Sequence, residues 1–146
     1  MEVNVDEDYF IPEAYVVPRD YIWSYQWHAA LYSLFPMPHT SIWYYYCSAQ
    51  AWVGLSKFSR AIELLEIAVE KYRPEEGSPV PRIYYETQYH LAFLLINHNP
   101  SEAKRLIETM LEADFDHCRT WELVGRLQFI LDESYKETAL HVLTLV

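Results

Sequence analysis

The sequence predicts an all-α fold of about seven helices that pair into antiparallel hairpins. Apolar residues recur at steps of three and four in one segment after another, most clearly over 57–72, as on the buried stripe of an amphipathic helix. The whole chain has only three glycines, and no alternating apolar run lies between hairpin-turn residues. Its length of 146 residues suits one domain.

Residues 1–19 are predicted to form an acidic, extended arm ahead of a helical domain over 20–146. Between residues 1 and 20 there are six acidic side chains and one basic side chain. Pro12 and Pro18 argue against a continuous helix, because proline fixes φ and has no N–H group to donate. The arm either lies extended on the domain or frays as a tail.

Three helices are predicted between the arm and the loop at 74–81. Each follows a residue whose side chain can cap the first turn, and Pro36 with Pro38 ends the first of them. The helices are 21–35 after Asp20, 41–54 after Thr40 or Ser41, and 57–72 after Ser56.

The second half of the chain predicts four more helices. The segment 74–81 holds three prolines and a glycine, and it therefore reads as a loop. Pro100 suits the first position of a helix, where its missing N–H is not needed. The helices are 82–97, 100–113, 117–131 after a cap at Asp116, and a last one from about Glu133 to Val146.

The charge of the chain limits the classes of partner. The formal net charge is −10, which would repel a phosphate backbone, so no nucleic-acid partner is expected. A basic partner surface would be attracted instead. The charges are absent from residues 21–56, which contain no Asp, Glu, Lys or Arg.

The same uncharged region is not predicted to span a membrane. A membrane helix needs about 20 consecutive apolar residues, and Pro36 with Pro38 divides the region into shorter pieces. Cys47 and Cys118 stand far apart in no metal-ligand spacing, which suits a reducing compartment. No signal peptide is evident. We therefore expect an intracellular, cytoplasmic protein, with the nucleus as an open alternative.

A repeat pattern emerges around the clearest amphipathic helix. Ala61 and Ala68 are small residues seven apart on its apolar stripe, and Pro74 follows. This pattern resembles the second helix of a tetratricopeptide repeat, in which small residues let paired helices approach closely. The resemblance places Ala49 and Trp52 at matching positions of the preceding helix. It implies a right-handed α-solenoid with helical pairs at about 41–73, 82–113 and 117–146, preceded by the lone helix 21–35.

The resemblance also implies a binding groove lined by the first helix of each pair. The family grips a carboxylate with Lys and Asn in its first repeat, but Tyr46 and Gln50 stand at those places here, so that clamp is not supported. A peptide or helix from a partner protein fits the mixture of aromatic and charged groups better. The groove positions are Trp43, Tyr46 and Gln50, then Glu86, Tyr89 and Phe93, and finally Arg119, Glu122 and Arg126.

Aromatic residues crowd the first two predicted helices. Tyr44, Tyr45 and Tyr46 are consecutive, so they point about 100° apart around a helix, whereas a surface helix buries only one stripe. Core packing is the simpler reading for any single ring. Some rings must nevertheless be covered by a neighbouring helix, by the arm or by another molecule, and Tyr and Trp are enriched at binding hot spots. We add Trp23 and Trp27 to the expected partner-binding residues.

No catalytic motif is found in the chain. A Gly-rich phosphate loop, a nucleophile elbow, H-E-x-x-H and C-x-x-C are all missing. A site built around His90, His98 or Cys118 stays a minor alternative, because metal binding would need further ligands. We therefore predict no enzyme activity, no cofactor and no metal.

These observations predict a protein–protein interaction module, either an adaptor or a scaffold. Its partner would be another protein or a second copy of the chain, bound through the uncharged aromatic N-terminal half and the groove. Self-association through that half is the leading variant. The alternative is a small acidic inhibitor or chaperone that neutralises a basic protein.

Overall fold

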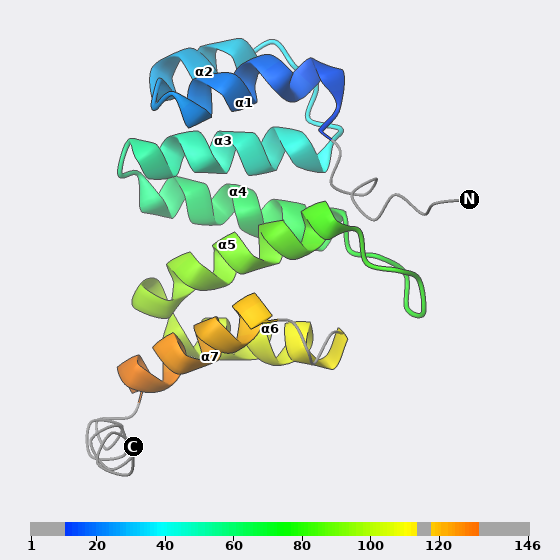
Figure 1. Cartoon of the computed structure of the whole chain (residues 1–146), viewed down its shortest axis with the longest axis vertical. Helices are drawn as coiled ribbons and strands as arrows, with labels where there is room; N and C mark the ends of the chain where they lie inside the picture. The colour runs from blue at the N-terminus through cyan, green and yellow to red at the C-terminus, as the bar shows by residue number, and fades with distance from the viewer. Residues whose placement is uncertain (1–10, 114–117, 132–146) are drawn as a thin grey trace. The chain divides into compact units, whose positions relative to one another are not determined.

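The computed structural model describes residues 11–113 and 118–131, and it folds them into helices without any strand (Figure 1). This confirms the all-α prediction for the described part of the chain. A 3₁₀ turn, η2 (Glu13–Tyr15), comes first. The helices are α1 (Val16–Trp23), α2 (Trp27–Leu34), α3 (Ile42–Gly54), α4 (Phe58–Lys71), α5 (Arg82–His98), α6 (Pro100–Ala113) and α7 (Cys118–Leu131). The predicted cap at Asp116 and the predicted last helix from Glu133 lie outside the described residues.

The chain divides into two compact units, Met1–Gln88 and Tyr89–Val146. In the first unit, α1 and α2 form an antiparallel hairpin whose two helices both pack against α3. The next hairpin joins α3 to α4 (Figure 1). In the second unit, α6 packs against α7. The α1–α2, α3–α4 and α6–α7 pairs thus pack as neighbours within their units.

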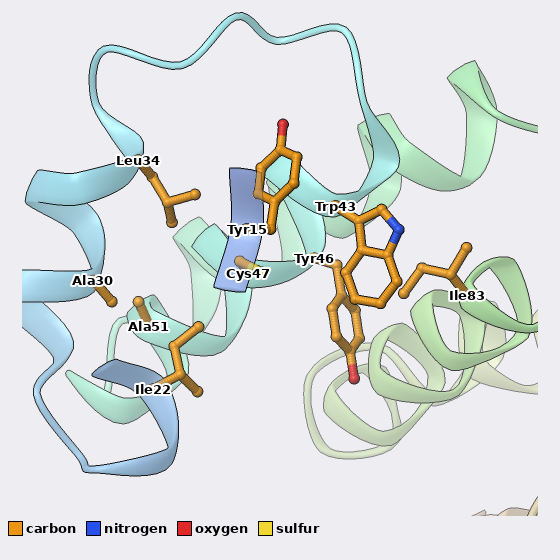
Figure 2. Close-up of a cluster of buried hydrophobic side chains, with 9 residues drawn as sticks. All are labelled: Tyr15, Ile22, Ala30, Leu34, Trp43, Tyr46, Cys47, Ala51 and Ile83. Carbon is orange, nitrogen blue, oxygen red and sulfur yellow. The ribbon is translucent and has the colours of Figure 1, made fainter. Parts of the chain in front are cut away.

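The core of the first unit surrounds α3. Figure 2 shows Trp43 and Tyr46 on one side of this helix beside Ile83, while Cys47 and Ala51 lie toward the α1–α2 hairpin. The buried cluster consists of Tyr15, Ile22, Ala30, Leu34, Trp43, Tyr46, Cys47, Ala51 and Ile83. Because α3 is covered by α2 on one side and by α4 on another, it buries far more of its circumference than a surface helix does.

The extended-arm prediction is wrong from Glu13 onward, where η2 and α1 form. Pro18 occupies the first turn of α1, where backbone N–H groups have no partner within the helix. A proline is therefore tolerated there, and its ring is buried. Asp20, which was predicted to cap a later helix, lies inside α1.

The single helix predicted over 21–35 is divided in two by a turn at 24–26. The Gln26 N–H donates to the Tyr21 carbonyl at 2.8 Å, and the Tyr25 N–H donates to the Ile22 carbonyl at 3.1 Å. This pair of bonds is a Schellman motif, which requires a left-handed residue after the helix. Tyr25 takes that conformation, with φ of 60°. Glycine is the usual residue there, and its absence from the sequence hid the turn.

The predicted cap at the start of α3 is confirmed. The Trp43 N–H donates to the Ser41 hydroxyl at 3.2 Å, as a capped helix requires. Ser56, predicted to cap the next helix, instead takes φ of 61° after α3, in a second Schellman turn. There the Lys57 N–H donates to the Trp52 carbonyl at 2.9 Å. Helix α4 consequently begins one residue later than predicted, at Phe58.

The small residues of the repeat pattern are buried on α3 and α4, two helices that pack against each other. Ala49, Ala61 and Ala68 are all buried, and a methyl group at each position lets the two helix backbones approach closely. This packing is compatible with the tetratricopeptide resemblance but is not specific to it, so the repeat assignment stays a prediction.

The second unit contains the C-terminal part of α5 together with α6 and α7. Pro100 opens α6 as predicted. Ala103, Ile107 and Met110 form the buried stripe of α6 at steps of four and three. Leu123 and Leu127, one turn apart, are the buried leucines of α7.

Candidate protein-binding surfaces

A groove opens between α5 and α7 in the second unit. Its volume is about 470 Å³. The lining residues, which define the α5–α7 groove, are Phe93, Ile96 and Asn97 from α5 and Glu122, Gly125, Arg126, Phe129 and Ile130 from α7. Phe93, Phe129 and Ile130 remain substantially exposed. Among the described residues, the groove therefore offers apolar contact area rather than a filled core.

Two arginines from α7 lie over aromatic rings from α5. The Arg119 Cζ atom is 3.9 Å from the ring centroid of Tyr89, and the Arg126 Cζ atom is 5.2 Å from that of Phe93. The two rings are stacked, with centroids 6.4 Å apart, because they stand one helical turn apart on α5. Both distances are within the range of a cation–π attraction. The edge of each guanidinium, which carries its N–H donors, can then face a ligand.

The charges of the groove are not neutralised internally. Glu122 stands one turn before Arg126, but no ion pair joins them, and none of the salt bridges within the described residues involves Arg126. Both side chains are exposed. Arg126 can therefore form a bidentate contact with a carboxylate of a bound chain.

A second surface lies on the α1–α2 hairpin. Four large aromatic side chains protrude from it, and they define the α1–α2 aromatic face: Trp23 at 69% exposed, Tyr25 at 77%, Tyr32 at 85% and Phe35 at 84%. His28, Tyr32 and Phe35 follow one another at steps of four and three, so they share one side of α2. Ala30 and Leu34, which are buried, occupy another side.

Trp27 is the first residue of α2 and lies at the turn end of this hairpin. Its ring lies edge-on to that of Tyr25, with centroids 5.7 Å apart. A shallow hollow of about 360 Å³ adjoins it, lined by Tyr25, Gln26, Trp27, His28, Ala29 and Leu55. On α1, one turn before Trp23, the Arg19 guanidinium lies 4.5 Å from the Trp23 ring centroid and pairs with Asp20 at 3.2 Å. The charges beside the aromatic face are therefore already paired with each other.

Some of the predicted contact residues are buried, and the others are accessible. Trp43 and Tyr46 are core residues, 9% and 8% exposed, and their rings pack edge to face with centroids 5.8 Å apart. Other helices of the chain cover α3, so both rings serve the core, and their contact with a partner stays a prediction that their burial does not favour. Glu86 is likewise buried, and Gln50 is half-buried on α3.

The remaining predicted residues are accessible. Phe93, Glu122 and Arg126 line the α5–α7 groove, and Tyr89 with Arg119 forms the adjoining cation–π pair. Trp23 is exposed on α1, and Trp27 is half-buried beside Tyr25. Tyr25, Tyr32, Phe35, Phe129 and Ile130 were not selected. For Tyr32 and Phe35 the sequence did contain a signal. At 100° per residue around the helix, both lie on a different side from Ala30 and Leu34, which are buried.

The described cysteines and histidines give little sign of a metal or thiol site. Burial raises the pKa of the Cys47 thiol to about 12, so the reactive thiolate is scarce at neutral pH. His98 Nδ1 lies 2.9 Å from the Leu94 carbonyl oxygen of its own helix. Within residues 11–113 and 118–131, no three His, Cys, Asp or Glu side chains gather in a way that could hold a metal ion.

Each helix in the described ranges is too short or too polar to cross a lipid bilayer. The chain matches no protein-family model, no curated protein and no solved structure. The arrangement of side chains on the two surfaces is consequently the basis for the functional argument that follows.

Proposed function

We propose that the protein is a non-enzymatic interaction module that binds a peptide or helix of a partner protein in the α5–α7 groove. The observation that carries this proposal is the pairing of Arg119 with Tyr89 and of Arg126 with Phe93 beside an open apolar groove. Apolar side chains of the partner would fill the groove, and a carboxylate would meet the edge of Arg126. Grooves of this kind receive amphipathic segments at spaced anchor positions.

The chemistry of the groove favours an acidic rather than a basic ligand. The lining contains one guanidinium group, that of Arg126, and one carboxylate, that of Glu122. Arg126 lies over the Phe93 ring at the apolar part of the groove, so a carboxylate of the ligand would meet it there. The alternative of an acidic inhibitor that neutralises a basic protein draws on the net charge of −10 and would use surfaces outside this groove. A binding rate that falls steeply with salt would favour that alternative.

A random peptide library displayed on phage and selected on the full chain tests the proposal. We expect the selected peptides to share an acidic residue next to aliphatic or aromatic residues. Phe93→Ala and Arg126→Ala should each weaken binding of a selected peptide by at least about fivefold, as central interface contacts do. Arg105→Ala is the matched control, because this exposed arginine lies on α6 and pairs with Glu102.

Two results would count against this function. One is a selection without any shared pattern among the peptides. The other is a set of selected peptides that bind Phe93→Ala and Arg126→Ala as tightly as they bind the unchanged chain.

A further inference from the structure

We propose that the α1–α2 aromatic face binds the same face of a second copy of this chain, forming a two-fold symmetric dimer. This inference concerns a different surface from the α5–α7 groove and does not depend on the proposed function. It rests on the exposure of four rings, on the charge around them, on the area that they offer and on the backbone at Tyr25.

The exposed rings are not explained by the fold. The α1–α2 hairpin buries Ile22, Ala30 and Leu34 against the core, so its packing against α3 is already complete. Trp23, Tyr25, Tyr32 and Phe35 lie off that stripe and leave most of their surface exposed. Single exposed apolar residues are ordinary, but several large rings on one hairpin are typical of an interaction site.

The charge pattern suits a second copy as the occupant. In a two-fold interface each patch faces itself, so a charged patch would repel its own copy. The chain carries a net charge of −10, yet residues 21–56 contain no charged side chain. The nearest charges on α1, Arg19 and Asp20, pair with each other. Two copies of the α1–α2 aromatic face can therefore meet without placing like charges in direct contact.

The exposed area reaches what a dimer needs. An aromatic side chain presents about 150–250 Å², so four rings that are 69–85% exposed offer on the order of 600 Å². Two copies that covered all four rings on each side would bury roughly 1,200 Å², which is the lower bound for a specific protein–protein interface. Tyr and Trp are also the side chains most often found at interface hot spots.

The backbone at Tyr25 adds a further argument. A non-glycine residue with positive φ is disfavoured by contact between its Cβ atom and the backbone, and glycine fits the Schellman turn better. The chain nevertheless places an exposed tyrosine at φ of 60°. This ring contributes little to the core of its own unit, but at the tip of the hairpin it is well placed to contact another molecule.

Sedimentation equilibrium of the full chain over a range of concentrations provides the first measurement. The unchanged chain should form a dimer. Tyr32→Glu with Phe35→Glu should weaken the dimer at least about tenfold, because like charges would face each other across the two-fold axis. Both rings are mostly exposed, so circular dichroism should show an unchanged fold. Ile67→Glu, an exposed apolar position on α4, is the matched control and should leave the dimer intact.

A mixing experiment separates a second copy from any other occupant. A chain with Tyr32→Glu and Phe35→Glu is mixed with one carrying Tyr32→Lys and Phe35→Lys, and native mass spectrometry reads the species formed. A heterodimer should form where neither variant dimerises alone. Tyr25→Gly should also weaken the unchanged dimer, without loss of folding stability.

A monomeric unchanged chain at its highest soluble concentration would overturn the proposal and would point to a different protein as the occupant of this face. A dimer that survives both glutamate substitutions would overturn it as well, because the interface would then lie elsewhere.

Discussion

The indole of Trp27 lies so close to Gly54 that a methyl group on Gly54 would overlap its ring atoms. This contact joins the start of α2 to the last residue of α3. Helix α2 can therefore seat its tryptophan only because Gly54 has no side chain. The contact fixes one end of the α1–α2 hairpin on α3. It thereby also fixes the position of Tyr25, two residues before Trp27.

Gly54→Ala should destabilise the protein. Alanine is favoured over glycine in a helix by about 1 kcal/mol, but overpacking against a rigid ring costs about 1–3 kcal/mol. The overlap involves the central atoms of the indole rather than a flexible side-chain end, so the cost should exceed the gain. Urea unfolding followed by circular dichroism measures the change.

Gly125→Ala is the control for that substitution. Nothing lies within 4 Å of the position that a methyl group would take at Gly125, so the helix preference should act alone and raise stability by up to about 1 kcal/mol. Equal changes in stability for Gly54→Ala and Gly125→Ala would contradict the close contact between Trp27 and Gly54.

The hydroxyl of Tyr72 should contribute nothing to folding stability. It is buried without a hydrogen-bond partner among the described residues, so Tyr72→Phe should leave the free energy of unfolding unchanged or raise it by about 1 kcal/mol. Tyr84 is the matched case, because its hydroxyl donates to the Val69 carbonyl at 2.8 Å. Tyr84→Phe should lower stability by about 1 kcal/mol. A larger loss at Tyr72 than at Tyr84 in thermal unfolding would show that this hydroxyl has a partner.

Cys47 should make stability fall at alkaline pH. Burial raises the folded-state pKa of its thiol from 9.0 to about 12. As the pH rises above 9, the unfolded chain therefore releases this proton first, and folding loses up to about 1.4 kcal/mol per pH unit until the folded-state pKa is reached. Cys47→Ala should remove this part of the pH dependence, as measured by urea titrations of both proteins between pH 8 and 11. Parallel curves for the two proteins would contradict the assignment.

The stability lost when an aromatic residue is replaced by alanine should depend on whether the ring is buried, not on which aromatic residue it is. Trp43 is in the core and Trp23 is on the surface. Trp43→Ala should cost about 3–5 kcal/mol, whereas Trp23→Ala should change stability by less than about 0.5 kcal/mol. Denaturant midpoints of both variants test this contrast. A large loss for Trp23→Ala would mean that its ring is covered by the chain itself.

Local signals in the sequence predicted most helix ends correctly. Ser41 caps α3, Pro100 opens α6, and the steps from Ala61 to Ala68 mark the buried side of α4. The failures have physical causes. Pro18 is harmless in a first turn, and Tyr25 adopts a left-handed conformation that local preference assigns to glycine. A first-turn proline loses no helical hydrogen bond and so could have been accommodated, whereas no sequence signal marks a left-handed tyrosine.

The candidate contact residues were harder to predict for α3 than for α5 and α7. Helix α3 has no polar side, so periodicity could not show that Trp43 and Tyr46 pack toward Ile83, about 40 residues later in the chain. In α7 the charged residues Glu122 and Arg126 fall on the exposed side. Helix α5 instead buries Glu86, Thr87 and Gln88, so polarity alone does not show which side of it is exposed. The repeat resemblance selects Tyr89, Phe93 and Arg126, while Phe129 and Ile130 resemble ordinary core residues.

Chemical-shift mapping of a library-selected peptide on the isotopically labelled full chain tests the central claim most directly. Binding in the α5–α7 groove predicts that the perturbed backbone amides gather at 89–97 and 119–130, with smaller changes elsewhere. Perturbations that instead gather on α4 or α6, or that spread evenly over the chain, would contradict the account.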